Sequence, residues 1–324
     1  GEIAYRVALY FKEKNDMESA EEYLRKTILL SPSNLNAKFL LATYLNSQKR
    51  YSEALSLFNK LIAAQPNQEE YRIGLTESLY YLGKYADARK TIRLIALKEN
   101  ASTEALRWAG LAYRALEIPD TAKQLLEASI ANDNKCGECF VALGDIYFDE
   151  SDFKLASSYF KSAMDANGFN QKAALKLARS YHRLGDTQSA QRLFEEIIAK
   201  GSQNGEAIYR LTHYLLQDNQ IRESKEIIAK NGTQRHGWYY LSDAEISIAE
   251  GKIDAALTSL NRAKKLLPDA PEIQAAMGKI ELNRKKYNAA IMNFAQAMVG
   301  DPENIGIMLD MGKAYEGAKE FDNA

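Results

Sequence analysis

The sequence predicts an all-α protein, built as a solenoid of about nine and a half helical hairpins. Three observations support this prediction. One pattern recurs with a period of 34 residues, two columns of the repeat hold only small residues, and apolar residues between these columns keep helical spacing. A chain of 324 residues would ordinarily divide into about two compact domains, but repeats bury surface mainly against their neighbours. We therefore predict a single solenoid over residues 1–324.

The clearest copy of the repeat is residues 137–170, and its pattern sets the phase for the others. Six residues define it: Leu143, Gly144, Tyr147, Ala156, Phe160 and Ala163. The first six units keep the 34-residue step, the seventh is two residues shorter, and the last is partial. The predicted repeats are 1–34, 35–68, 69–102, 103–136, 137–170, 171–204, 205–236, 237–270, 271–304 and 305–324.

The two small columns predict that each unit is a pair of closely packed antiparallel helices. Position 20 of the repeat holds Ala in every unit except the seventh, which has Ser224, and position 8 holds only Ala, Gly or Thr. A bulky side chain at either position would hold the helix axes apart. We expect proline at position 32 to end the second helix and a polar residue at position 18 to cap its start. These residues are Pro32, Pro66, Pro268 and Pro302, and Ser52, Asp120, Asp254 and Asn288.

The seventh repeat departs from this pattern. Ser224 replaces Ala, and Asn231–Gly232 is a stop signal for the second helix. Residues 233–237 are expected to form a loop. The sequence leaves open whether the superhelical pitch changes here or the loop is merely irregular.

The pattern resembles the tetratricopeptide repeat (TPR) family over the whole chain. The family signature is Trp-x2-Leu-Gly-x2-Tyr, then Ala-x3-Phe and then Pro, on a 34-residue period. In residues 137–170, Phe140 stands in the Trp slot and Gly168 in the Pro slot, and the other slots match. The resemblance implies a right-handed superhelix that binds other proteins. It also implies that positions 2, 5, 6, 9, 12 and 13 of each first helix face a concave groove.

Composition excludes several classes of function. The formal net charge is −1 and 46% of the residues are apolar, which shows no general bias towards nucleic acid or anionic membrane. No apolar run approaches the roughly 20 residues that span a bilayer, so we expect no membrane insertion by this fragment. The sequence opens at Gly1 and its last repeat is partial, so we expect a piece of a longer protein.

The groove columns predict a charged surface in repeats five to seven. An acidic band in repeat five is followed by a basic band in repeats six and seven. A basic band suits an acidic peptide segment or a terminal carboxylate, because guanidinium groups supply paired donors. The alternative is a solvated surface on which the two bands neutralise each other. The acidic residues are Glu138, Asp145 and Asp149, and the basic ones are Lys172, Lys176, Arg179, His182, Arg183, Arg210 and His213.

Repeats two to four carry aromatic and apolar residues in the same columns. Exposed patches of this kind bind partners, and Trp, Tyr and Arg are favoured anchors. The alternative, ordinary packing between adjacent first helices, weighs equally. The candidate anchors are Phe39, Tyr80, Tyr81, Arg107, Trp108 and Arg114.

Cys136 and Cys139 form the motif Cys-Gly-Glu-Cys where repeats four and five meet. Such a motif suggests a redox pair or half of a zinc site. Zinc normally takes four ligands and no second pair exists, and a thioredoxin-like site requires a βαβ unit that this chain lacks. We therefore interpret the cysteines as small residues tolerated at a turn. The sequence does not decide whether they form a disulfide.

No motif for catalysis, a cofactor or a metal is evident. The histidines His182 and His213 are predicted to be groove residues, and there is no Gly-rich phosphate loop, His-Glu-x-x-His motif or nucleophile elbow. The leading hypothesis is thus a non-catalytic scaffold that binds protein or peptide segments in its groove. One alternative is the recognition arm of a larger enzyme or of an envelope secretion or polysaccharide-export protein. RNA binding through the basic band is disfavoured by the balanced charge.

Overall fold

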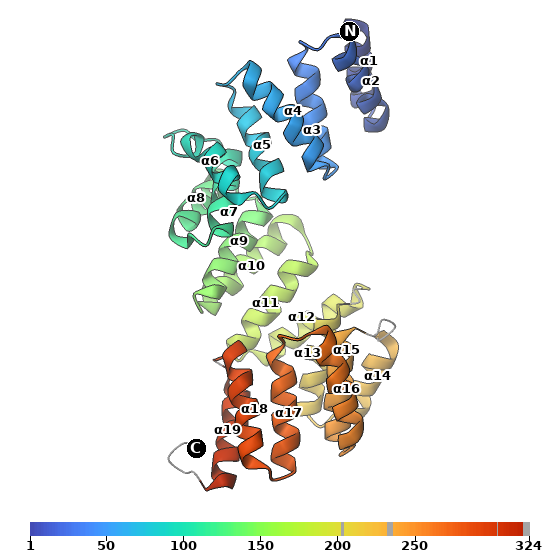
Figure 1. Ribbon diagram of the computed structural model, residues 1–324, viewed down its shortest axis with the longest axis vertical. Coiled ribbons are helices and arrows are strands. Elements are labelled where there is room, and N and C mark those ends of the chain that lie inside the picture. Colours follow the sequence, from blue (N-terminus) through green and yellow to red (C-terminus); the bar gives the residue numbers. More distant parts are fainter. Residues whose placement is uncertain (202–203, 232–235, 303, 320–324) are drawn as a thin grey trace. The chain divides into compact units, whose positions relative to one another are not determined.

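The computed structural model describes residues 1–201, 204–231, 236–302 and 304–319, and this part of the chain is all-α (Figure 1). From the second repeat onward, each first helix begins at the predicted repeat boundary, which confirms the fold class. The nineteen described helices are α1 (Glu2–Glu13), α2 (Met17–Leu30), α3 (Leu35–Ser47), α4 (Tyr51–Ala64), α5 (Glu69–Tyr81), α6 (Tyr85–Ala96), α7 (Thr103–Ala115), α8 (Pro119–Asn132), α9 (Gly137–Asp149), α10 (Phe153–Asn167), α11 (Gln171–Arg183), α12 (Thr187–Ala199), α13 (Gly205–Gln217), α14 (Ile221–Asn231), α15 (Gly237–Ala249), α16 (Ile253–Leu266), α17 (Pro271–Asn283), α18 (Tyr287–Gly300) and α19 (Ile305–Ala318).

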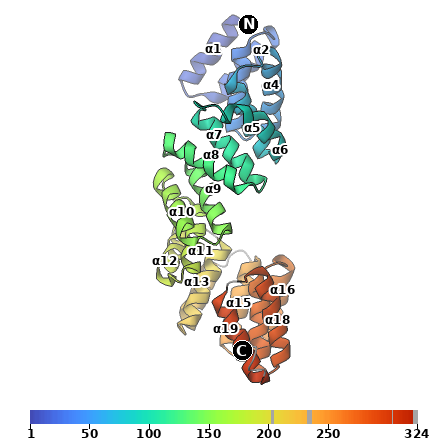
Figure 2. The same cartoon turned by 90° about the vertical axis from the view of Figure 1, so that its left-hand side faces the viewer.

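The chain divides into two compact units, residues 1–173 (unit 1) and residues 174–324 (unit 2). Consecutive helices pack against one another from α1 to α10 in unit 1 and from α12 to α19 in unit 2, and the first helices of successive repeats lie side by side (Figures 1 and 2). In unit 1 these neighbours are α3, α5, α7 and α9, and in unit 2 they are α13, α15, α17 and α19. One continuous solenoid over both units stays a prediction.

The small columns lie where the two helices of a hairpin meet. Every described residue at position 20 has an exposed fraction of 0%. A Cβ added to Gly144 at position 8 would lie 2.6 Å from the ring of Phe160, and one added to Gly278 would lie 2.6 Å from the ring of Phe294. The absence of a side chain at position 8 therefore makes room for the large residue at position 24 of the same unit.

The predicted cap at position 18 is wrong, because the hairpin turn places the start of the second helix earlier. Position 15 has a positive φ in all ten repeats, as at Asn15 and Gly83. This left-handed residue reverses the chain so that position 16 becomes the N-cap and position 18 lies inside the first turn of the helix. Where position 16 is an aspartate, its carboxylate accepts a hydrogen bond from the N–H of residue 19 of the unit, with N···O distances of 3.0–3.1 Å at Asp16, Asp152 and Asp186.

The ends of the second helices follow the sequence signals. The four helices that precede a proline at position 32 end two residues before it, as α4 does at Ala64. In the seventh repeat, α14 ends at Asn231 as predicted, and with 11 residues it is the shortest of the described helices. Of the loop predicted over residues 233–237, residues 233–235 lie outside the described residues, as do residues 232 and 320–324. The loop was predicted one residue too long, because Gly237 is the first residue of α15 and His236 is its N-cap. The change of pitch at this repeat stays a prediction.

Candidate functional site

The predicted aromatic anchor of unit 1 is a cluster of rings from α4, α5, α6 and α7. Tyr81 stacks on Tyr51 with 4.7 Å between ring centroids, and both Tyr80 and Tyr81 lie 5.7 Å from Trp108. Trp108 is only 2% exposed, whereas Tyr81 is 43% exposed. Trp108 thus supports the cluster from inside, and Tyr81 is the ring that a partner could contact.

The other candidate anchors of unit 1 are also partnered. Phe39 is half-buried against Phe58 and Tyr71. The guanidinium of Arg107 lies over the Trp108 ring at 4.7 Å, and its buried Nε makes no hydrogen bond with a described residue. Ordinary packing therefore accounts for much of this predicted patch.

The acidic band of repeat five is bound to neighbours within unit 1. Glu138 accepts a hydrogen bond from the Tyr81 hydroxyl at 2.8 Å, and Asp145 is buried and forms an ion pair with Arg114 at 2.7 Å. Asp149 and Arg114 line a cavity of about 540 Å³ between α7 and α9. Two predicted groups, the aromatic cluster and the acidic band, are therefore joined by the contact between Tyr81 and Glu138.

A buried polar network that the sequence reading missed connects α3 and α5. Asn46 is 3% exposed, donates through Nδ2 to Gly74 O and Glu77 Oε2 at 3.0 Å each, and accepts from Ser78 Oγ at 2.7 Å. Burial raises the pKa of Glu77, although the hydrogen bond from Asn46 opposes this rise. The signal in the sequence is an Asn at position 12, which is a groove column.

In unit 2, the arginines of the basic band are paired with carboxylates from other repeats. The sequence separation of these pairs ranges from 27 to 118 residues, so they join surfaces that are far apart along the chain. The pairs are Arg179–Glu206 (2.8 Å), Arg183–Asp301 (2.5 Å) and Arg210–Glu272 (2.6 Å). Lys172 is exposed at the start of α11, outside unit 2, and Lys176 is half-buried. The predicted contact between the basic band and the acidic band stays a prediction.

Arg210, Glu272 and Asp301 border a pocket of about 370 Å³ within unit 2, which we call the unit 2 pocket. Its wall is built by side chains of α11, α13, α15, α17, α18 and α19. Of the predicted residues, His182, Arg210 and His213 line it. Sequence reasoning missed Glu245, Lys279, Asp301, Asp310 and Lys313. Glu245, Lys279 and Lys313 all occupy position 9 of their repeats, so extending the groove columns to repeats eight to ten would have found them.

Neighbouring charges and hydrogen bonds determine the ionisation of Glu245 in this pocket. His213 Nδ1 donates to Glu245 Oε2 at 2.8 Å, the Tyr209 hydroxyl donates to Glu245 Oε1 at 3.3 Å, and Gln217 Nε2 lies 3.0 Å from His213 Nε2. Burial alone would raise the pKa of Glu245, but His213, the charge of Lys279 and the Tyr209 hydroxyl lower this pKa to about 2. Glu245 is therefore a fixed negative charge at neutral pH.

His182 is the neutral histidine of the pocket. Its Nδ1 lies 2.7 Å from the Tyr214 hydroxyl, and burial together with the charges of Arg210 and His213 lowers its pKa to about 4. Burial also raises the pKa of Tyr214 to about 12, so the phenol keeps its proton and donates it to Nδ1. His182 is therefore an uncharged part of the wall at pH 7.

Lys279 and Arg210 have donors that no described residue uses. Lys279 is half-buried in the pocket wall and makes no hydrogen bond or ion pair with any described side chain. Arg210 donates through Nη2 to Glu272, but its buried Nε has no hydrogen-bond partner in the described chain and lies 3.9 Å from Glu206 Oε1. The pocket therefore combines paired ions with unused cationic donors.

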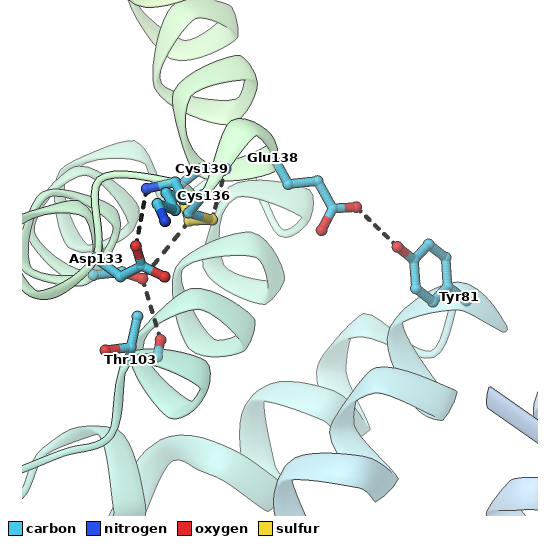
Figure 3. Close-up of a disulfide and its surroundings, with 8 residues drawn as sticks. Tyr81, Thr103, Asp133, Cys136, Glu138 and Cys139 are labelled. Carbon is cyan, nitrogen blue, oxygen red and sulfur yellow. Dashed lines mark hydrogen bonds between the residues drawn. A yellow bond between two sulfur atoms is a disulfide. The ribbon is translucent and has the colours of Figure 1, made fainter. Parts of the chain in front are cut away.

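The two cysteines form a disulfide, which answers the question that the sequence left open. It joins Cys136, the N-cap residue of α9, to Cys139 one turn later (Figure 3). The interpretation of these residues as merely small turn residues is thus incomplete.

Among the described residues no group of three or more His, Cys, Asp or Glu is arranged to hold a metal ion. None of the described helices has the length and apolar content needed to cross a membrane.

Comparison with known families decides the classification of the chain. The family model described as Tetratricopeptide repeat matches residues 75–135 and 141–207, and the model described as Anaphase-promoting complex, cyclosome, subunit 3 matches residues 13–95. The chain belongs to the TPR family. TPR units are typically non-catalytic and generally mediate contacts between proteins.

Individual relatives are distant. The chain is 23% identical to human Protein O-mannosyl-transferase TMTC1 over 192 residues, which are 58% of this chain and 22% of that protein. It is 21% identical to Cellulose synthase operon protein C of Pseudomonas fluorescens over 287 residues, which are 84% of this chain and 20% of that protein. The TPR chain thus spans about a fifth of the length of these two relatives. A crystal structure of the APC/C hetero-tetramer Cut9–Hcn1 matches with a TM-score of 0.53 at 17% identity, over 93% of this chain and 59% of that chain, which shows a shared fold.

Proposed function

We propose that this TPR chain is a non-catalytic scaffold that binds segments of a partner protein on the concave face of its first helices. The unit 2 pocket is the observation that carries the proposal. Five first helices contribute to its wall, and its volume of about 370 Å³ can take one or two side chains of a bound segment. A surface built in this way by many repeats suits an extended segment.

The partner segment is acidic in this proposal. Lys279 is half-buried in the pocket wall and forms no ion pair or hydrogen bond with a described residue, although its charge acts on the Glu245 carboxylate, so its ammonium donors are open to a carboxylate of the partner. Arg179, Arg183 and Arg210 already form ion pairs with carboxylates, and of these three only Arg210 lines the pocket. The mixed charges along the wall then select the register of the segment more than they add affinity.

Unit 1 provides a second surface in this proposal. Tyr81 is exposed and held by its hydrogen bond to Glu138, and Arg107 extends along the buried ring of Trp108. Rigid aromatic and guanidinium groups of this kind lose little conformational entropy when a partner binds. We infer that an apolar or aromatic side chain of the partner packs against Tyr81.

Site-specific photo-crosslinking tests the scaffold function. A photoreactive residue is placed at Gln217, which is exposed and lines the unit 2 pocket, and in a control at Lys264, an exposed residue of the second helix α16. We expect position 217 to crosslink a defined segment of one partner in native extract, identified by mass spectrometry, and position 264 not to do so. Equal labelling by both positions would argue against a binding groove.

Charge reversal then tests the acidic segment. Lys279→Glu and the double variant Lys176→Glu/Arg179→Glu are each expected to lower the affinity for the captured partner by about tenfold or more. Lys264→Glu makes the same charge change on α16 and is expected to bind like the unchanged protein. If all variants bind equally, the partner does not use the cations of the groove.

A second function follows from the size of the relatives. The chain matches a fifth to a third of several longer proteins, among them a protein named as an O-mannosyl-transferase and one named for a cellulose synthase operon. This supports the proposal that these repeats are the recognition arm of a longer protein with an enzymatic or polysaccharide-export role. The complete reading frame tests it: a catalytic, barrel or membrane segment in the same chain supports the arm, and a frame of TPR units alone contradicts it.

A further inference from the structure

The two sulfur atoms of the disulfide differ in their access to solvent. Cys136 is partly exposed at the start of α9, whereas Cys139 has an exposed fraction of 0% and belongs to the core cluster that contains Trp108 and Leu126. A thiolate breaks a disulfide by attacking one sulfur in line with the S–S bond, so access decides which sulfur is attacked. The accessible member of this pair is Cys136.

Cys136 also occupies a position at which other repeats place an N-cap residue. Asn34, Ser102 and Asn204 each accept a hydrogen bond from the N–H three residues later through a side-chain oxygen. In α9 the acceptor is Sγ of Cys136, which lies 3.2 Å from the Cys139 amide nitrogen. This N–H and the positive end of the α9 dipole both stabilise a negative charge on that sulfur. A thiolate at Cys136 would therefore be a better leaving group than an ordinary cysteine thiolate.

The acidic side chains next to the disulfide in sequence have hydrogen-bond partners of their own. Glu138 lies between the two cysteines in sequence, but its carboxylate points away to the Tyr81 hydroxyl (Figure 3). The Asp133 carboxylate accepts from the Lys135 amide at 3.0 Å. On the buried side, Ser129 Oγ lies 3.7 Å from Cys139 Sγ and donates to Thr103 O at 3.1 Å. The buried sulfur thus has a hydroxyl neighbour, which suits a neutral thiol.

We propose that the Cys136–Cys139 disulfide is a thiol–disulfide exchange site that takes two electrons from a dithiol through Cys136. A thiolate of the dithiol bonds to Sγ of Cys136, the S–S bond breaks, and its electron pair leaves on Sγ of Cys139, which takes up the proton that the first thiol released on ionising. The second thiol of the dithiol ionises, attacks its partner sulfur in this mixed disulfide and displaces Cys136 as a thiolate, which takes up the second proton. The dithiol is oxidised to a disulfide and the protein is reduced to two thiols, so atoms, protons and electrons balance.

This chemistry acts at the binding surface, because the disulfide closes a small ring that contains Glu138. While the ring is closed, the backbone of Glu138 is held and its carboxylate meets Tyr81. Reduction opens the ring and releases that constraint on the groove of unit 1. In this proposal, the concentration of reducing dithiols around the protein controls whether Glu138 in the unit 1 groove is constrained.

The test compares the two single thiols in the full chain. In Cys139→Ser, the remaining Cys136 is expected to react with iodoacetamide about a hundredfold faster than Cys139 does in Cys136→Ser, with a pH midpoint below the value of about 8.5 for a free thiol. Serine is the natural N-cap at Ser102, so Cys136→Ser keeps a cap, and circular dichroism checks that both variants fold. In the unchanged protein, one equivalent of dithiothreitol is expected to be oxidised per chain.

The proposal would be overturned by equal rates for the two thiols, by a midpoint at or above that of a free thiol, or by two free thiols in protein that has not been reduced. A disulfide in the folded chain that dithiothreitol reduces only after urea is added would do the same, because it would show that Cys136 is closed to thiols. The mixed disulfide itself is expected on Cys136, and peptide mapping after trapping would locate it.

Discussion

Acid is expected to weaken unit 2 through His182. The ring is buried and lies near Arg210 and His213, which lowers its pKa to about 4 from the ordinary value of 6.5, although the Asp301 carboxylate favours the charged form and Arg183 opposes it. In the unfolded chain the same ring takes up a proton near pH 6.5. Because the folded pKa is the lower one, its contribution to stability is present above pH 6.5 and is lost as the pH falls towards 4.

The size of this effect follows from the two pKa values. Between them, each pH unit changes the free energy of unfolding by about 1.4 kcal/mol, so lowering the pH from 7 to 5 removes about 2 kcal/mol through this one group. In His182→Asn the side-chain oxygen can still accept from Tyr214, but no proton can be gained. We therefore expect the variant to lose about 2 kcal/mol less than the unchanged protein over this interval.

Urea unfolding at pH 7 and pH 5, followed by the fluorescence of Trp238, measures this difference. Trp238 belongs to unit 2 and packs on Tyr209 at 5.3 Å between ring centroids. Repeat proteins do not always unfold in one step, so an NMR titration of the His182 ring provides a direct check. A ring that titrates near pH 6.5, or a variant as sensitive to acid as the unchanged chain, would refute the reasoning.

Two further predictions concern packing and buried polar groups in unit 1. Gly144→Ala would place a Cβ 2.6 Å from the Phe160 ring, and we expect a loss of about 1–3 kcal/mol in thermal unfolding, whereas Gly306→Ala, with a single neighbour at 3.3 Å, is expected to be neutral. Asn46→Ala removes the donor to Glu77 and the acceptor for Ser78, so urea unfolding is expected to show a loss of about 1–3 kcal/mol. An unchanged midpoint in Asn46→Ala would mean that water replaces these contacts.

Much of the fold is predictable from the sequence because its main constraint is local. A small residue at position 8 and another at position 20 of each unit specify where two helices cross, and this requirement repeats every 34 residues. The helix starts of nine successive repeats follow from that phase alone. The caps did not follow, because acidic and polar residues favour both the N-cap and the first turn of a helix. The left-handed residue at position 15, for example Asn15, shows which of the two is the N-cap, because the N-cap at position 16 follows it directly.

The candidate site is less predictable, because its contacts connect repeats that are distant in sequence. The groove columns correctly place His182, Arg210 and His213 on first helices, and the structure brings these residues to one pocket. Their carboxylate partners, such as Asp301 for Arg183, depend on how the helices of unit 2 lie against one another. Charge patterns along the chain do not contain that information.

The sequence by itself determined the all-α repeat and its phase, because these depend on side-chain size and periodicity within each unit. Tertiary structure decided which of the candidate site residues are available to a binding partner. Packing buries Trp108, pairs the arginines of the basic band and leaves Lys279 without an ion pair to a described residue. The contact between Cys136 and Cys139 is instead local, because the first turn of α9 brings the two sulfurs within bonding distance. Burial and pairing are properties of neighbours in space, and a repeat pattern predicts them only within its own unit.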